Sequence, residues 1–254
     1  MRIGIIGVGH LAATIVARLM STGWSSEGLV LAPRGKSAEL AVEHGLHIAA
    51  DNADLVSACD VVLLCVRPAD APAAVAGLPW REGQTLVSAC AGVTLRDLQH
   101  ASGLARVVRI MPLTAMLLGA SPTTVYPNAP ELRPMLERLG SVLPLRSEAE
   151  LEVATTTAAV YGWVQDLVLA TTDWLVEHGL EPATARQLTA RTFTAAGRLT
   201  AESPEALEDL MRSIVTPGGI TELGLTTLAA NGAPEAWLKA CEAVRARLAG
   251  ARSR

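Results

Sequence analysis

The first twenty residues constrain the fold more than any other stretch of the chain. An apolar run at Ile3–Ile6 has the length of one buried strand, and apolar residues at helical spacing follow from Leu11. Between them the chain reads Gly7-Val8-Gly9-His10-Leu11-Ala12. A first glycine allows a tight bend, a second lets the backbone approach a pyrophosphate, and a small third residue lets helix and strand pack closely. This pattern predicts a dinucleotide-binding turn, with cofactor contacts from Gly7, Gly9, His10, Leu11 and Ala12.

Length and charge exclude several classes of protein. The chain has 254 residues, half of them hydrophobic, which is enough for two domains with their own cores. A net charge of −4 and dispersed arginines argue against a nucleic-acid partner. The apolar runs end well short of the roughly 18 residues of a membrane span, and the first strand lacks the features of a signal peptide. We therefore expect a cytoplasmic protein with no membrane partner. The four cysteines and five histidines show no metal-ligand spacing, so no metal is expected.

The loop after the second predicted strand, Leu29–Ala32, bears on the choice of cofactor. Enzymes that use NAD usually place Asp or Glu here to bind the ribose 2′-hydroxyl. This chain instead has Arg34 and Lys36, which can bind a 2′-phosphate, with Ser37 adding a hydroxyl. The loop favours NADPH, with NADH as an alternative cofactor. A solvated surface turn without a ligand is the other interpretation.

Strands and helices alternate through the rest of the first half. We predict strands near 47–49, 61–66, 85–89, 106–110, 123–126 and 141–145, and helices near 37–44, 52–58, 131–139 and from Leu95, which Thr94 can cap. Such alternation is typical of an α/β fold, a doubly wound parallel sheet of the Rossmann type. We assign residues 1–146 to this dinucleotide-binding domain. The loops at 66–68, 90–94 and 111–114 follow strands, where α/β proteins bind their ligands.

The pattern becomes helical throughout from Ser147. Helices are expected near 147–178, 182–200, 204–213, 220–230 and 234–249, so that residues 147–254 form a helical substrate and dimerisation domain. This half carries large apolar residues such as Trp163, Leu167, Trp174 and Phe193. A helical layer this apolar buries more of its surface when it packs against a second subunit, so we expect a homodimer.

One segment, Val215–Thr221, interrupts the helical pattern. Its Pro217-Gly218-Gly219 sequence precedes a helix and exposes backbone N–H groups at the positive helix end, which suits a carboxylate or another anion. Thr221 lies in the first turn, where its hydroxyl can donate as well. A tight turn between helices with no ligand is the alternative.

Five segments in order resemble the pyrroline-5-carboxylate reductases. Their IGxGxMA start, VKP loop, AGVT segment, RxMPNTP segment and SPGGTT segment are matched, fully or in part, by Ile6–Ala12, Val66–Pro68, Ala91–Thr94, Arg109–Ala115 and Thr216–Thr221. The resemblance covers most of the chain, and its segments are spaced comparably.

The resemblance implies a Rossmann domain followed by a helical dimerisation domain, and a role in proline biosynthesis. It also implies hydride transfer from a nicotinamide to the C=N carbon of a cyclic imine, bound at the dimer interface near the diglycine turn. Carried over residue by residue, further cofactor contacts come from Val66, Arg67, Pro68, Ala91 and Gly92. Substrate contacts come from Met111, Leu113, Tyr161, Trp163, Gln165, Gly218, Gly219 and Thr221, with Thr221 the candidate catalytic residue.

Several positions depart from the family pattern. His10 and Leu113 each stand where the family has Asn, and Ala115 replaces a Pro. The small-residue SGSGPAY stretch is replaced by Thr157–Trp163. These changes remove small and polar groups near the expected substrate and add bulk. They favour a diverged member that reduces a different imine, for example in a specialised biosynthetic pathway.

The chemistry requires few ionisable side chains. A cyclic imine accepts hydride as its iminium form, so the protein mainly has to position the reactants and exclude water. Lysine occurs only at Lys36 and Lys239, which leaves none in the first half of the helical domain, where 3-hydroxyacid dehydrogenases use one. Two alternatives stay open: a reductase of another acceptor, of the deazaflavin type, and an NADP(H)-binding sensor or scaffold without turnover.

Overall fold

The computed structural model describes residues 1–250 as two compact units. The first consists of Met1–Ala158 together with the end of the last helix from Arg245, and the second of Ala159–Val244. The functional division expected between residues 146 and 147 stays a proposal. Within residues 1–250 no helix is long and apolar enough to cross a membrane.

The first unit is built on a sheet of eight strands, ordered β3-β2-β1-β4-β5-β6-β7-β8. The strands are β1 (Ile3–Ile6), β2 (Leu29–Leu31), β3 (His47–Ile48), β4 (Val61–Leu64), β5 (Thr85–Ser88), β6 (Arg106–Met111), β7 (Thr123–Tyr126) and β8 (Val142–Pro144). All neighbours run parallel except β6 and β7, which are antiparallel. The predicted α/β Rossmann fold is thus confirmed, as a mostly parallel sheet.

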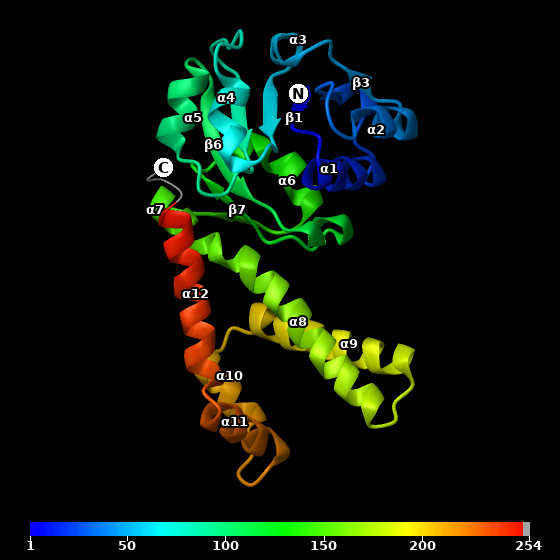
Figure 1. Ribbon diagram of the computed structural model, residues 1–254, viewed down its shortest axis with the longest axis vertical. Helices are drawn as coiled ribbons and strands as arrows, with labels where there is room; N and C mark the ends of the chain where they lie inside the picture. The colour runs from blue at the N-terminus through cyan, green and yellow to red at the C-terminus, as the bar shows by residue number, and fades with distance from the viewer. Residues whose placement is uncertain (251–254) are drawn as a thin grey trace. The chain divides into compact units, whose positions relative to one another are not determined.

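Helices cover both faces of this sheet (Figure 1). One core packs beneath α1 (His10–Ser21), α2 (Ser37–His44) and α6 (Arg133–Leu139). The other packs beneath α3 (Asn52–Ala58), α4 (Ala71–Val75) and α5 (Leu95–Ser102). Side chains alternate between the two cores along β1, β2, β4, β5 and β6, so Ile5 belongs to the first and Ile6 to the second. This burial on both faces explains why the strands read as continuous apolar runs.

Short elements complete the first unit. The 3₁₀ turns are η1 (Ser26–Gly28), η2 (Pro68–Asp70), η3 (Thr114–Leu118) and η4 (Pro130–Leu132). The hydroxyl of Thr94 accepts a hydrogen bond from the Asp97 N–H at 3.1 Å, which confirms the predicted cap of α5. The predicted helix near 131–139 divides into η4 and α6.

The helical run predicted from Ser147 to His178 is two helices rather than one. Helix α7 (Glu148–Ala154) lies in the first unit, and α8 (Thr156–Glu177) begins after Thr155. Threonines cluster at this junction. The Thr155 hydroxyl donates to Leu151 O at 2.8 Å and the Thr157 hydroxyl to Ala154 O at 2.7 Å. Such hydroxyls compete with main-chain N–H groups for helical carbonyls, which weakens the helix locally.

The second unit is helical, with most of α8 followed by α9 (Pro182–Glu202), α10 (Leu207–Ile214), α11 (Ile220–Ala230) and α12 (Ala233–Gly250) up to Val244. It buries few of its large apolar side chains. Ile220 is 90% exposed, Leu223 69% and Trp174 56%. Because monomers rarely expose so many large apolar side chains, these helices have the character of an association surface.

Candidate active site

The glycine turn after β1 has the geometry that a bound pyrophosphate requires. Gly7 has a φ of +88°, and a Cβ at this position would lie 2.6 Å from Val66 N, so no other residue fits. Gly9 precedes α1, and its N–H donates to Gly7 O at 2.9 Å. A Cβ on Gly9 would meet nothing within 4 Å. The missing side chain therefore leaves open space in front of the turn, where a ligand can approach the backbone.

The first turn of α1 offers unused donors to that space. Ala13 N–H is the first to bond back, to Gly9 O at 3.0 Å, so the N–H groups of His10, Leu11 and Ala12 have no acceptor within the helix. No side chain caps this end and no acidic residue stands in its first turn. The positive end of the helix dipole is thus available to an anion.

The loop after β2 is held beside the glycine turn. Lys36 N–H donates to Val8 O at 2.8 Å, and Val8 pairs with Gly35 in an isolated bridge. Gly35 has a φ of +82°, and a Cβ there would lie 2.2 Å from Val8 O. The side chains of Arg34 and Lys36 are exposed and form no ion pair within residues 1–250, so two cations stand free next to the turn.

The Ser37 hydroxyl is not placed to bind a 2′-phosphate, contrary to what the sequence suggests. Its side chain is buried at 1% exposure, with the hydroxyl 2.5 Å from Ala32 O and 3.0 Å from Arg34 O. The hydroxyl bonds to carbonyl groups within the loop and is too buried to contact a 2′-phosphate.

The loops after β4 and β5 lie at the same sheet edge. Cys90 Sγ is 3.3 Å from Val66 O, which joins the segment before Ala91 and Gly92 to the segment before Arg67 and Pro68. Arg67 is exposed and pairs with Asp70 at 3.0 Å. Burial raises the pKa of the Cys65 and Cys90 thiols, so these loops offer no thiolate.

Met111 and Leu113 follow at the end of β6. The Leu113 N–H donates to the hydroxyl of Ser121 at 2.8 Å, and Ser121 is fully buried. The structure therefore gathers the predicted residues of the first unit at the carboxyl edge of the parallel strands β1, β2, β4, β5 and β6, as the sequence indicates: Gly7, Gly9, His10, Leu11, Ala12, Arg34, Lys36, Val66, Arg67, Pro68, Ala91, Gly92, Met111 and Leu113.

A buried ion-pair network beside this edge was not found by sequence reasoning. Arg109 of β6 is 2% exposed, and its Nη1 contacts Glu152 Oε1 and, at 2.7 Å, Glu148 Oε1. Glu148 Oε1 also accepts the Leu95 N–H at 2.7 Å. The network thus connects β6, the start of α5 and helix α7. Two signals in the sequence were available: an arginine inside an apolar strand, and glutamates four residues apart on one helix face.

In the second unit, the residues expected to contact substrate on α8 divide between two faces. Tyr161 and Gln165 are four residues apart and share a face, whereas Trp163 lies on another. The ring of Trp163 meets that of Trp237 edge to face, with centroids 5.4 Å apart.

The predicted diglycine turn precedes α11, as expected. Gly218 has a φ of +73°, which favours glycine, and a Cβ on Gly219 would lie 2.4 Å from Thr216 Oγ1 and 2.9 Å from Thr216 O. Gly219 N–H donates to Thr216 O at 2.9 Å, and Gly218 N–H donates to Glu222 Oε2 at 2.7 Å. Two of the backbone donors are therefore already engaged within the chain. Thr221, in the first turn of α11, is exposed.

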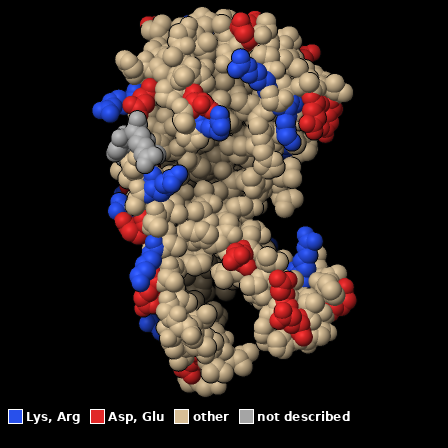
Figure 2. Space-filling view, viewed as in Figure 1, with Lys and Arg blue, Asp and Glu red and all other residues tan. Residues whose placement is uncertain are grey.

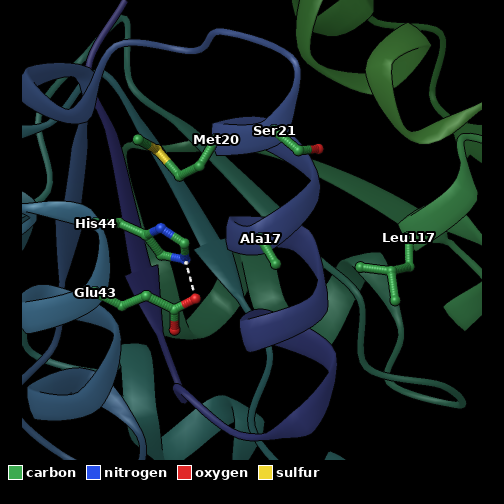
Figure 3. A pocket seen from close by; sticks show the side chains of 6 residues that line it. All are labelled: Ala17, Met20, Ser21, Glu43, His44 and Leu117. Atoms are coloured by element: carbon green, nitrogen blue, oxygen red, sulfur yellow. Dashed lines mark ion pairs between the residues drawn. The ribbon is translucent and has the colours of Figure 1, made fainter.

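A surface pocket of about 680 Å³ lies elsewhere in the first unit (Figure 3). It is lined by Ala17, Met20 and Ser21 of α1, Glu43 and His44 of α2, and Leu117 of η3. His44 Nε2 and Glu43 Oε1 are 3.6 Å apart. Met20 lies ten residues beyond His10 on α1, about 15 Å along the helix axis. The pocket is thus separate from the nucleotide turn.

The face of the described chain in Figure 2 carries side chains of both charges. Basic and acidic side chains are interspersed on the face that Figure 2 shows, in keeping with the net charge of −4. Among residues 1–250 no three His, Cys, Asp or Glu side chains come together as metal ligands.

A Rossmann sheet with a free anion-binding turn, followed by a helical unit with exposed apolar faces, defines a nicotinamide-dependent oxidoreductase of the type that carries a helical second domain. Residues 2–92 match the family described as NADP oxidoreductase, coenzyme F420-dependent, and residues 148–250 match the pyrroline-5-carboxylate reductase dimerisation family. A curated pyrroline-5-carboxylate reductase of Pseudomonas aeruginosa is 30% identical over 91% of this chain and 89% of its own length. The chain belongs to the pyrroline-5-carboxylate reductase family.

Other relatives support the same family membership. Pyrroline-5-carboxylate reductase 3 of Xenopus laevis is 29% identical over 96% of this chain and 94% of its own. The crystal structure of the Streptococcus pyogenes 1-pyrroline-5-carboxylate reductase superposes with a TM-score of 0.86 at 25% identity, covering 100% and 99% of the two chains. The Plasmodium falciparum enzyme, solved with NADP bound, has a TM-score of 0.87 at 21% identity, covers 99% and 98%, and supports the fold. The predicted cofactor class, NADP(H), is confirmed at the level of the family.

Proposed function

We propose that this chain reduces a cyclic imine, 1-pyrroline-5-carboxylate or a related pyrroline, with NADPH. The observation that carries the proposal is the open glycine turn, with three unused N–H groups and two free cations beside it, in a chain of this family. A dinucleotide with a 2′-phosphate fits this arrangement, because its pyrophosphate can accept from the N–H groups and its 2′-phosphate can pair with the cations.

The residues of the first unit fit this cofactor. In our proposal Gly7 and Gly9 allow close approach, the N–H groups of His10 to Ala12 bind the pyrophosphate, and Arg34 and Lys36 bind the 2′-phosphate. The loops containing Val66, Arg67, Pro68, Ala91 and Gly92 flank the rest of the dinucleotide. NADPH, when bound, supplies the hydride that the carbon of the C=N bond accepts.

For the substrate, we propose the contacts that the family resemblance implies: Met111 and Leu113 within residues 1–158, and Tyr161, Trp163, Gln165, Gly218, Gly219 and Thr221 within residues 159–244. Thr221 is the proposed catalytic residue, because its exposed hydroxyl can donate a hydrogen bond to the substrate. The iminium form already carries its proton, so these side chains need only orient the ring and exclude water.

The proposal includes a homodimer formed through the helical half. It is supported by the match to a dimerisation family over residues 148–250 and by the exposed apolar side chains of α8 to α11.

The decisive experiment is a turnover assay. Purified protein is mixed with NADPH and a panel of cyclic imines of different ring size, with and without a carboxylate, and the loss of NADPH absorbance is followed. Steady oxidation that depends on one imine supports the proposal. Tight NADPH binding without turnover of any imine would refute it and support a sensor or scaffold.

A second candidate has one specific observation in its favour. The match over residues 2–92 is to a family of coenzyme F420-dependent NADP oxidoreductases, so a deazaflavin acceptor belongs in the same panel. Oxidation of NADPH by a deazaflavin, with none by any imine, would establish this second function.

A further inference from the structure

The loop that follows β5, residues 91–94, carries two of the residues proposed to contact the cofactor, and its own main chain does little to hold it. Gly92 has a φ of +74°, and within residues 1–250 the N–H groups of Ala91, Gly92 and Val93 donate no hydrogen bond. Gly92 and Val93 are nevertheless buried. The shape of loop 91–94 therefore depends on the contacts at its two ends.

The two ends of the loop are bonded to different elements. At the first end, Cys90 N–H donates to the Ser88 hydroxyl at 3.2 Å, and Cys90 Sγ lies 3.3 Å from Val66 O. At the second end, Leu95 N–H donates to Glu148 Oε1 of α7 at 2.7 Å. Leu95 is the first residue of α5, where the helix itself offers no acceptor for that N–H. Glu148 thus connects the end of the loop to a separate helix.

Glu148 is held in turn by a buried cation. The same Oε1 lies 2.7 Å from Nη1 of Arg109, whose side chain is 2% exposed and belongs to β6, the strand next to β5. Glu152, one turn further along α7, contacts the same nitrogen. Hydrogen bonds between charged groups are roughly twice as strong as neutral ones. These contacts connect the sheet to the end of the loop, and β6, α5 and α7 all belong to the first unit (Figure 1).

The strand order indicates which half of the dinucleotide lies near this loop. The loop with Arg34 follows β2, on one side of β1, whereas β4 and β5 lie on the other side. A dinucleotide held by its pyrophosphate at the turn after β1 extends across the sheet in both directions. In the proposed complex its adenosine half therefore lies toward Arg34 and its nicotinamide half toward loop 91–94.

We propose that Glu148 is a positioning residue for the nicotinamide half of NADPH. Through the Leu95 N–H it holds loop 91–94 in the shape in which Ala91 and Gly92 contact the cofactor, and Arg109 holds the Glu148 carboxylate in place. The inference rests on the proposed function and deepens it, because it adds a residue that acts through a neighbouring loop.

Two substitutions at Leu95 separate the effect of the N–H from that of the side chain. Leu95→Pro removes the N–H that Glu148 accepts, and proline suits the first residue of a helix. Thr94 has φ −77° and ψ 156°, a conformation that residues before proline adopt. Leu95→Ala keeps the N–H and measures the loss of the side chain. Glu148→Ala removes the acceptor, and its control is Glu150→Ala, which removes an acid of the same helix that pairs with the exposed Arg146.

Calorimetric titration gives the Kd for NADPH and for adenosine 2′,5′-bisphosphate, which lacks the nicotinamide half. Glu148→Ala should raise the Kd for NADPH by about tenfold, and Leu95→Pro should raise it by about tenfold beyond Leu95→Ala. Neither Glu148→Ala nor Leu95→Pro should alter the Kd for the bisphosphate, which a general loosening of the first unit would raise as well. Combining the two should cost no more than one of them, because both remove the same hydrogen bond. Glu150→Ala should bind both ligands as the wild type does.

An unchanged Kd for NADPH in Glu148→Ala, or an equal rise for both ligands, would overturn the proposal, as would additive losses in the combined variant. If Leu95→Pro does not fold, Glu148→Ala and Glu150→Ala give the same comparison by themselves. The titrations need no turnover, so failure of the proposed function is distinct: it appears as absence of NADPH oxidation with every imine.

Discussion

Replacing Arg109 by methionine should lower the free energy of unfolding by about 3–5 kcal/mol, the usual cost of breaking a buried ion pair from one side. Glu152 accounts for most of this loss, because its side chain is only 10% exposed and its Oε1 contacts the Arg109 guanidinium. Burying a carboxylate without its cation is costly. Glu148 contributes less, because it is 30% exposed and keeps the Leu95 N–H.

Urea unfolding followed by circular dichroism measures the effect, at one fixed protein concentration because association adds to apparent stability. The matched control is Arg133→Met, which removes an exposed i,i+4 pair with Glu137 on α6 and should cost only about 0.3–0.5 kcal/mol. Equal losses in Arg109→Met and Arg133→Met would refute the reasoning. A double variant, Arg109→Met with Glu152→Leu, should recover much of the loss, because it removes the uncompensated charge as well.

Four further predictions concern the cofactor turn, the substrate and the core. Arg34→Ala should weaken NADPH binding by about tenfold or more and leave NADH binding nearly unchanged in fluorescence titrations; an unaltered preference would exclude a 2′-phosphate contact. Gly35→Ala should impair NADPH binding and lower stability, since its Cβ would lie 2.2 Å from Val8 O; wild-type values for both would contradict the strained turn. Thr221→Ala should reduce kcat/KM for the imine with the Kd for NADPH retained, and parallel losses would place the hydroxyl outside the substrate site. Burial raises the pKa of Cys59 from 9.0 to about 11, so the folded state binds the proton more tightly and unfolding should become easier as pH rises across that interval; Cys59→Ala should flatten this dependence, and an identical slope would exclude the thiol as its source.

Much of the fold could be predicted because its signals are local. Helix α2, helix α3 and helix α11 begin and end where the patterns and breakers place them. The glycine turn could be recognised for the same reason, since a positive φ at Gly7 depends on neighbours in the chain. Short elements such as α4 were not predicted, because five residues carry too little periodicity.

The direction of β7 could not be predicted from local sequence signals. An apolar run has the same pattern whichever way it enters a sheet, so alternation with helices predicted a parallel strand where the structure has an antiparallel one. The resemblance to a family identified the segments around the candidate site. It did not show that Ser37 is buried or that Glu222 occupies the Gly218 N–H.

By itself the sequence determined that this protein has a strand, a glycine turn and a helix arranged for a dinucleotide, followed by a helical half with apolar faces. These features depend on backbone sterics and on side-chain periodicity over a few residues, both of which are written along the chain. Only the tertiary structure decided which polar groups are already engaged, such as Arg109 with Glu148 and Glu152. Those contacts join residues about 40 positions apart, and the energy of a charge depends on what folding places beside it.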